Sequence, residues 1–296
     1  MFKKNLVGWV ESNFDIYKIA YSTYGGGINT HPSLIEHMIK NYDCKGTFYH
    51  LEIRGVIVGA CYINDKGKIG LDVWRKFPIT YDEVLIPLSR EVKSFLPLHT
   101  NRLSMRNKRN VLNTSYNLLS KNKLCVVKDS FSKKTTKNRR NQMNKFIAAG
   151  GTVRSVEEFS PEELTTIYIT LFKKRFGETV RCYTRESLLD LMTHFKHMIF
   201  GHILFIKDSI PCAFDLIIKA ECQNWFYFDV PNGGVDPEYN YLSPGSVLMW
   251  LNINAAKEMS RTLSKECIFT LGLYQKNWEY KLLWCDAVPL GKVIYF

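Results

Sequence analysis

The chain has no apolar run long enough to cross a bilayer. A membrane-spanning helix needs about 18 consecutive apolar residues, and the longest apolar stretches here, such as residues 56–63, are short and bounded by turn residues. Behind the two lysines of residues 1–5 there is no apolar segment, because Glu11 and Asp15 interrupt it. The start therefore differs from a secretory signal, and we expect the protein to stay on the cytoplasmic side.

Paired cysteines and clustered histidines are also missing. The eight cysteines are scattered without a C-x-x-C pair, and several lie in apolar strand-like runs where a free cysteine acts as a small hydrophobe. This spacing argues against a zinc site or a disulfide framework. His194 and His197 share a helical face, but no carboxylate-rich or cysteine partner lies near them in sequence. We interpret both as partly exposed helix residues and expect no metal.

What the chain does have is length and an ordinary globular composition. Its 296 residues are 46% hydrophobic and 23% charged, which is typical of folded domains and not of disordered chains. The length is generous for one domain and sufficient for two, each with its own core.

Positive charge is concentrated in one central segment. Residues 91–145 contain 14 Lys and Arg but only two acids, Glu91 and Asp129, so this segment carries the whole net charge of +12. Such a surface suits a polyanion, whether nucleic acid, acidic lipid headgroups or a phosphorylated cofactor. A merely solvated basic helix face is the alternative, and charge alone does not name the anion.

Two similar successions of elements are predicted. Helical patterns at residues 8–22 and 33–41 precede strand-like runs at 48–53, 56–63 and 69–74. A helical pattern at 186–199 precedes strand-like runs at 202–207, 211–220 and 223–230, with a turn at Asp208-Ser209. Together with the length, this repeat predicts two tandem lobes of an α/β (α+β) fold, each with a mixed sheet flanked by helices.

Helices are predicted between the two copies. Residues 136–149 form a helical pattern whose start is crowded with cations, which oppose the helix dipole and indicate an anion there. The next helix, residues 161–176, has Ser160 as N-cap, Pro161 as its first residue and Glu163 at N3.

The most informative segment is residues 225–285. A strand at 225–230 leads through a turn-rich loop to Ser243-Pro244-Gly245-Ser246 and a helix at 247–259. Ser243 is predicted to be the N-cap, and the free N–H groups of such a helix start can bind an anion. A strand at 267–271 follows and then the Tyr280-Lys281 pair between two tryptophans, either as surface residues or as a proton donor and a charge clamp.

These residues resemble the tandem acetyltransferase-like (GNAT/Fem-type) proteins. The resemblance covers about residues 130–290 and rests on Tyr227, the run 234–239 (GVDPEY), Ser243-Pro244-Gly245, and Gly272 followed by 279–284 (EYKLLW). It implies lobes at 1–128 and 129–296, the second with an acyl-donor cleft. The [Gln/Arg]-x-x-Gly-x-[Gly/Ala] loop that holds the pyrophosphate of acetyl-CoA in such enzymes is absent, so residues 243–246 would have to replace it.

A narrower resemblance includes the first half. Tyr24-Gly25-Gly26, the run 29–32 (NTHP) and the run 231–238 (PNGGVDPE) are similar to the bacterial Mig family of macrophage-inducible virulence proteins. This similarity implies a role in resistance to cationic antimicrobial peptides and a peripheral association with the inner membrane.

Two hypotheses follow. The first is an acyl- or aminoacyl-transferase acting in envelope modification, with acetyl-CoA, another acyl-CoA or aminoacyl-tRNA as donor. The second is a non-catalytic protein of the same fold whose basic segment binds an anionic membrane or nucleic acid, with DNA disfavoured for want of a helix-turn-helix. The candidate site residues are Tyr280, Lys281 and Asp229 for catalysis; Ser243, Gly245, Ser246, Lys133, Arg139 and Arg140 for the donor; and Asn232, Asp236, Tyr239 and Trp284 for the acceptor.

Overall fold

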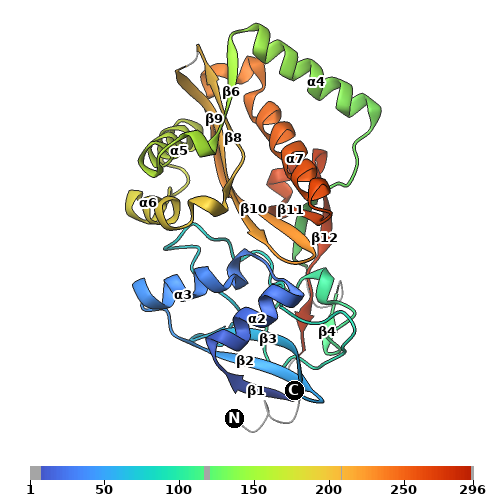
Figure 1. The fold of residues 1–296 in the computed structure, drawn as a ribbon. Helices are drawn as coiled ribbons and strands as arrows, with labels where there is room; N and C mark the ends of the chain where they lie inside the picture. Colours follow the sequence, from blue (N-terminus) through green and yellow to red (C-terminus); the bar gives the residue numbers. More distant parts are fainter. Residues whose placement is uncertain (1–7, 117–120, 208, 295–296) are drawn as a thin grey trace.

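The fold is that of a computed structural model, which describes residues 8–116, 121–207 and 209–294 (Figure 1). The N-terminal residues 1–5 and Asp208 of the predicted turn lie outside the described residues. Helices and strands alternate along the chain, which confirms the predicted α/β class, but only the largest sheet is mixed and the sheet of the first half is antiparallel.

The first half is built on a small antiparallel sheet in the order β1-β2-β3. Its strands are β1 (Trp9–Ser12), β2 (Gly46–Ile53) and β3 (Val56–Asn64). Between β1 and β2 the chain forms helix α2 (Phe14–Tyr24), the 3-10 turn η1 (Ile28–Thr30) and helix α3 (Pro32–Asn41). The predicted helix at 33–41 and the hairpin at 48–63 are confirmed.

Two predictions for this half are wrong. The pattern at 8–22 is not one helix, because residues 9–12 pair with β2, and Asn13 starts α2 by accepting a hydrogen bond from the amide of Ile16. Residues 69–74 are not a strand. Gly70 has a φ of +78°, in the left-handed region that ends an extended chain, and the amide of Leu71 donates to Asn29 instead of to β3.

The segment from 65 to 122 is largely irregular and links the two halves. It contains the 3-10 turn η2 (Met105–Asn107) and β4 (Thr114–Ser115), which pairs with β13 (Lys292–Val293) from the other end of the chain. Strand β5 (Lys123–Val127) follows and pairs with strands of the second half. The division into lobes at residue 128 stays a prediction, and the larger sheet begins before that point.

The second half contains an eight-stranded sheet in the order β12-β5-β11-β10-β9-β8-β6, with β7 added against β9. The strands not yet bounded are β6 (Gly151–Ser155), β7 (Ile199–Phe200), β8 (His202–Ile206), β9 (Ile210–Glu221), β10 (Trp225–Val235), β11 (Glu266–Leu273) and β12 (Cys285–Pro289). The predicted meander at 202–230 and the strand at 267–271 are confirmed. β10 and β11 pair in parallel, and the other pairs are antiparallel.

Helices cover both faces of this sheet (Figure 1). On one face lie α5 (Pro161–Phe176) and α6 (Arg185–His194), and on the other α7 (Pro244–Thr262) with α4 (Lys133–Ala148) packed against it. Short 3-10 segments complete the chain: η3 (Val156–Glu158), η4 (Lys196–Met198), η5 (Pro237–Leu242) and η6 (Lys276–Leu283). The helix predicted at 186–199 is shorter, since α6 ends at His194 and residues 199–200 join the sheet.

The core is shared between the halves. One cluster of buried side chains joins Tyr17 and Leu34 of the first half to Leu171 and Tyr227 of the second. The indole N–H of Trp225 donates to the carbonyl of Gly26 at 3.2 Å. The Gly25-Gly26 turn therefore serves as a contact for the larger sheet.

Among the described residues, no helix combines the length and the apolarity that a bilayer span requires.

Candidate functional site

The larger sheet opens where its two parallel strands stop pairing. β10 and β11 pair from Trp225–Glu266 as far as Asp229–Thr270. Beyond Asp229 the register of β10 shifts and the strand continues beside β9, while β11 continues beside β5. A polar cluster fills this divergence, and it includes the predicted catalytic residue Asp229.

Asp229 is buried, with 3% of its surface exposed. The hydroxyl of Thr80 donates to one carboxyl oxygen at 2.5 Å, and the hydroxyl of Thr270 donates to the other at 2.9 Å. Burial raises the pKa of Asp229 to about 7, with the two threonine hydrogen bonds acting against that rise. A carboxyl group of this kind changes protonation near neutral pH, which is what a general acid or base requires.

Two further acids come from the irregular segment before β4. The hydroxyl of Tyr227 donates to Glu83 at 2.7 Å, and burial raises the pKa of Glu83. Asp82 accepts the amide N–H of Leu273 at 3.2 Å. Gly272 makes this approach feasible, because it has a φ of +73° and a side chain there would meet Asp82 at 2.7 Å. Segment 80–83 thus brings polar groups of the first half onto the ends of β10 and β11.

Lys281 supplies a cation on the same side. Its ammonium donates to the carbonyls of Leu271 at 2.5 Å and Leu273 at 3.3 Å. Burial lowers its pKa, while the charges of nearby groups, Asp82 and Asp229 among them, act in the opposite direction. Tyr183 also interacts with these acids. Burial is the main cause of its raised pKa, and the charges of Asp229 and Asp82 add to the rise.

Not every predicted site residue is brought to this cluster. Tyr280 lies in η6 with 50% of its surface exposed. Trp284 is buried on the other face of the sheet, where Phe131 packs edge-on against its ring and the guanidinium of Arg139 lies 4.1 Å above it. The adjacent residues Tyr280 and Lys281 therefore have quite different surroundings.

Ser243 occupies the N-cap position of α7, as predicted, but it does not cap the helix through its side chain. Ser243 adopts a left-handed conformation with φ 54°, and its side chain makes no capping hydrogen bond. Helix α7 begins at Pro244, and the amides of Ser246 and Val247 both donate to the backbone carbonyl of Ser243. Gly245 faces Val235, since a side chain there would lie 3.2 Å from it. Anion binding at residues 243–246 stays a prediction.

The basic residues of α4 lie apart from that helix start. Arg140 lines a hollow of about 530 Å³ together with Trp250 and Lys257 from the middle turns of α7. At the other end of α4, Lys145 donates to the carbonyl of Tyr241. The 16 residues of α4 span about 24 Å, so Lys133, at its start, is a long way from Ser243. A ligand that meets both has to be large.

Three of the predicted acceptor residues follow one another in the chain, Asn232 near the end of β10, Asp236 at the N-cap of η5 and Tyr239 within η5. Asn232 accepts the amide N–H of Gly233 through its side chain. Asp236 is buried, caps η5 at the amide of Glu238 and accepts the ammonium of Lys174 at 2.5 Å. Tyr239 packs against the cluster under α7. Asn232 and Asp236 have local partners in the backbone or in α5, and their role in binding an acceptor stays a prediction.

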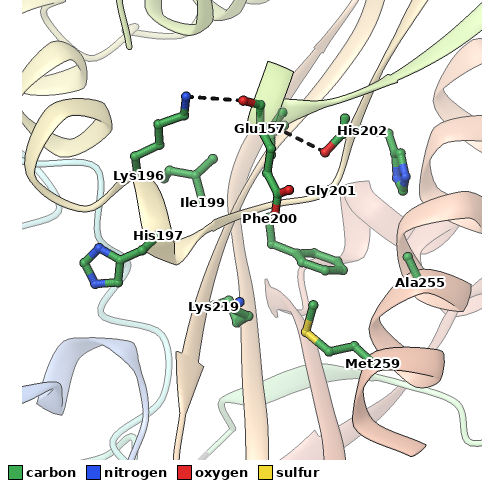
Figure 2. Close-up of a pocket in the computed structure, with 12 residues that line it drawn as sticks. Glu157, Lys196, His197, Ile199, Phe200, Gly201, His202, Lys219, Ala255 and Met259 are labelled. Atoms are coloured by element: carbon green, nitrogen blue, oxygen red, sulfur yellow. Dashed lines mark hydrogen bonds between the residues drawn. The ribbon is translucent and has the colours of Figure 1, made fainter. Parts of the chain in front are cut away.

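A second hollow, of about 420 Å³, lies between η3, η4 and the middle of α7 (Figure 2). Phe200, Lys219 and Met259 line it, and Lys196 at its edge donates to backbone carbonyls of η3 and the following residue. It is separate from the Asp229 cluster, because no residue of that cluster lines it.

Sequence reasoning found Asp229 and Lys281 but missed Thr80, Asp82, Glu83 and Thr270. Thr270 could have been found, because it lies in the predicted strand next to the predicted glycine turn. The other three are in an irregular segment about 150 residues before β10 in the sequence, and no local pattern marks them. Arg102, which donates to Asp82 at 3.3 Å, belongs to the same group of missed residues.

Solved structures with the same fold are transferase-like proteins. A crystal structure of FemX superposes with a TM-score of 0.58 at 9% identity, covering 97% of each chain. The structure of L-PGS from Bacillus licheniformis superposes with a TM-score of 0.54 at 11% identity, covering 95% of this chain and 91% of that one. These similarities assign the chain to the fold of Fem-type and lysyl-phosphatidylglycerol synthetase proteins.

The family profile of Mig-14 matches residues 31–293. The chain therefore belongs to the Mig-14 family, as the resemblance in its first half and in the 231–238 loop indicates. None of the curated proteins matches the chain by sequence.

Proposed function

We propose that this protein is an acyl- or aminoacyl-transferase whose reaction centre is the Asp229 cluster. The observation that carries the proposal is the buried carboxyl with a pKa of about 7 at the point where β10 and β11 separate. A carboxyl with only a structural role does not need a pKa near 7. A proton acceptor for an attacking amine or hydroxyl does. The fold shared with FemX and L-PGS supports the class of reaction.

In this reaction the acceptor's amine or hydroxyl attacks the carbonyl carbon of the donor's ester or thioester. Asp229 takes the proton that the nucleophile loses, and the donor's oxygen or sulfur leaves as the acyl group is transferred. The ammonium of Lys281 stabilises the negative charge that develops on the carbonyl oxygen. Thr80 contacts Asp229, which is shielded from solvent. Substrate would therefore reach the carboxyl only when segment 80–83 moves.

The donor has to carry extended negative charge. Exposed cations of α4 include Lys133 at its start and Arg140 near its middle, apart from Ser243, and a donor as large as aminoacyl-tRNA is able to meet several of these places at once. Lysyl transfer to a lipid, which the name of L-PGS denotes for that protein, makes a membrane lipid the acceptor to test first. Such a reaction lowers negative charge in the envelope and fits the resistance to cationic peptides that we infer for this family member.

The test is a transfer assay with radiolabelled aminoacyl-tRNA or acyl-CoA and a bacterial lipid extract. We expect labelled lipid with the unaltered protein and loss of label with Asp229→Asn or Lys281→Met. Tyr280→Phe is the matched control, because Tyr280 is adjacent in sequence but exposed. Equal transfer by Asp229→Asn and the unaltered protein would exclude the proposed centre.

A non-catalytic role is favoured by one observation, the exposed basic face of α4. We expect steep salt dependence of binding to anionic lipid vesicles, and loss of binding when Lys133, Lys134, Arg139 and Arg140 become Gln. Vesicle binding with no transfer of any donor tried would support this alternative, in which the protein acts peripherally at the membrane.

A further inference from the structure

Three side chains with metal-binding atoms meet between helices α3 and α6, away from the Asp229 cluster. The Nε2 of His37 lies 2.7 Å from one carboxyl oxygen of Asp190, and the Nδ1 of His194 lies 2.8 Å from the other. One ligand atom from each of the three residues falls within 4.8 Å of the other two. Figure 1 shows α3 and α6 on the same side of the molecule, where the two halves meet.

We propose that His37, Asp190 and His194 bind a Zn²⁺ ion that ties α3 of the first half to α6 of the second. Asp190 and His194 are one helical turn apart on α6, so both project from the same face. His37 comes from 153 positions earlier in the chain. The ion therefore crosslinks two segments that only the tertiary fold brings together.

The donor set suits this metal. Two imidazole nitrogens and one carboxylate oxygen are ligands that Zn²⁺ takes at roughly 2.0–2.2 Å, with water in the fourth position of a tetrahedron. Ligand atoms in such a tetrahedron are about 3.4 Å apart, whereas the two imidazole nitrogens lie 2.7 and 2.8 Å from different oxygens of Asp190, so the rings have to move back and turn toward one shared oxygen. His194 can do so readily, because 57% of its side chain is exposed.

The surrounding groups hold the ligands in place. The hydroxyl of Tyr42 donates to Asp190 at 2.8 Å, and the side-chain amide of Asn41 lies 3.1 Å from Nδ1 of His37. When Nε2 of His37 binds the metal, Nδ1 carries the proton. The side-chain amide of Asn41, which donates to the backbone carbonyl of His37 at 3.1 Å, then has to turn so that its oxygen accepts this proton. Burial opposes ionisation of Asp190, but hydrogen bonds from His37 and Tyr42 keep its pKa below the ordinary value.

The site has one closed side and one open side. The ring of Phe195 lies edge-on to His37 at 5.0 Å, and Phe77 lies at 6.1 Å. These rings keep solvent from the His37 side, since only 9% of that side chain is exposed. Exposed His194 leaves a path for the ion and a place for the fourth ligand, water.

The alternative is an ion pair without metal, in which a protonated His37 donates to Asp190. Metal titration of protein stripped with a chelator and kept reduced separates the two. We expect one Zn²⁺ per chain and a rise in unfolding temperature on adding Zn²⁺.

Variants locate the site. His194→Ala removes an exposed ligand, so the protein should remain folded while its Zn²⁺ affinity falls roughly tenfold or more. Asp190→Asn keeps the side-chain volume and should weaken binding similarly. His99→Ala, at an exposed histidine elsewhere, is the matched control and should bind as the unaltered protein does.

Cobalt substitution guards against binding by the free cysteines. Co²⁺ at the proposed site should give the visible absorption of a tetrahedral ion without the near-ultraviolet band of a thiolate ligand. Equal Zn²⁺ binding by His194→Ala and the unaltered protein would overturn the proposal, as would a thiolate band or failure to bind Zn²⁺ at all. Because none of these measurements depends on turnover, their failure is distinguishable from failure of the proposed transferase function.

Discussion

Replacing Asp229 with asparagine should make the protein more stable in neutral solution while it abolishes transfer. The pKa of this carboxyl in the folded state is about 7, against an ordinary value of 3.8. A raised carboxyl pKa means that the folded state holds its proton more tightly than the unfolded state does. The stability that comes from this proton is fully present below about pH 4 and is lost as the pH rises towards 7.

The magnitude follows from the shift. The difference of about 3 pKa units, at about 1.4 kcal/mol each, amounts to a loss of about 4 kcal/mol between pH 4 and pH 7. Asparagine has the same shape and no charge. One of the Thr80 and Thr270 hydroxyls can still donate to its amide oxygen, while the other has to turn and accept from its amide N–H. About 4 kcal/mol is thus the upper limit of the gain at pH 8.

The assay is denaturant unfolding of both proteins at each pH from 4 to 9, analysed as the difference between them. Other titrating groups are common to both, so this difference isolates Asp229. It should change by about 1.4 kcal/mol per pH unit up to pH 7 and then level off. Glu178→Gln, which removes an exposed carboxyl, is the control and should give a flat difference. A flat curve for Asp229→Asn, or lower stability than the unaltered protein at pH 8, would refute the reasoning.

Three further substitutions test the packing around the site and should be measured by the same unfolding assay. Gly234→Ala should destabilise the fold by about 2 kcal/mol or more, because its new side chain would meet the backbone of Leu171 in α5 at 2.4 Å; unchanged stability would mean that α5 does not pack there. Trp284→Ala should cost about 3–5 kcal/mol, since the ring is buried beneath Arg139, and a loss below 1 kcal/mol would argue for a ligand-binding role instead. Ser160→Ala should cost about 1 kcal/mol by removing the N-cap of α5, whereas Ser160→Thr, which keeps a capping hydroxyl, should lose much less.

Local features of the structure could be predicted because short stretches of sequence suffice to specify them. The helix at 161–176 has its cap, its first-turn proline and its acid at N3 within four residues, and the capping box forms as expected. The strands at 202–230 alternate with turn residues and form the expected meander. Failures occurred where tertiary contacts compete with a local pattern. Trp9 illustrates this: it lies in a helix-like run, but its strand pairs with β2 and its ring is buried.

The candidate sites depend far more on the tertiary structure. Asp229 stood out in the sequence because it lies near the end of a predicted strand, and Lys281 because the Tyr280-Lys281 pair lies between two tryptophans. Their partners Thr80 and Asp82 could not be identified, since nothing in an irregular segment tells which distant strand it will reach. The contact between α3 and α6 could not be identified from the sequence either, because His37 lies 153 positions before Asp190. Asp190 and His194 share a helical face that can be read from their spacing.

By itself, then, the sequence determined the α/β class, most of the strands and helices, the concentration of positive charge, and the family resemblance. Periodicity and capping act over a few residues and are visible in one dimension. Only the tertiary structure decided that burial raises the pKa of Asp229 to about 7 where β10 and β11 separate, and that His37 contacts Asp190. Burial and long-range proximity are properties of the packed chain, and these are what give the side chains their chemistry.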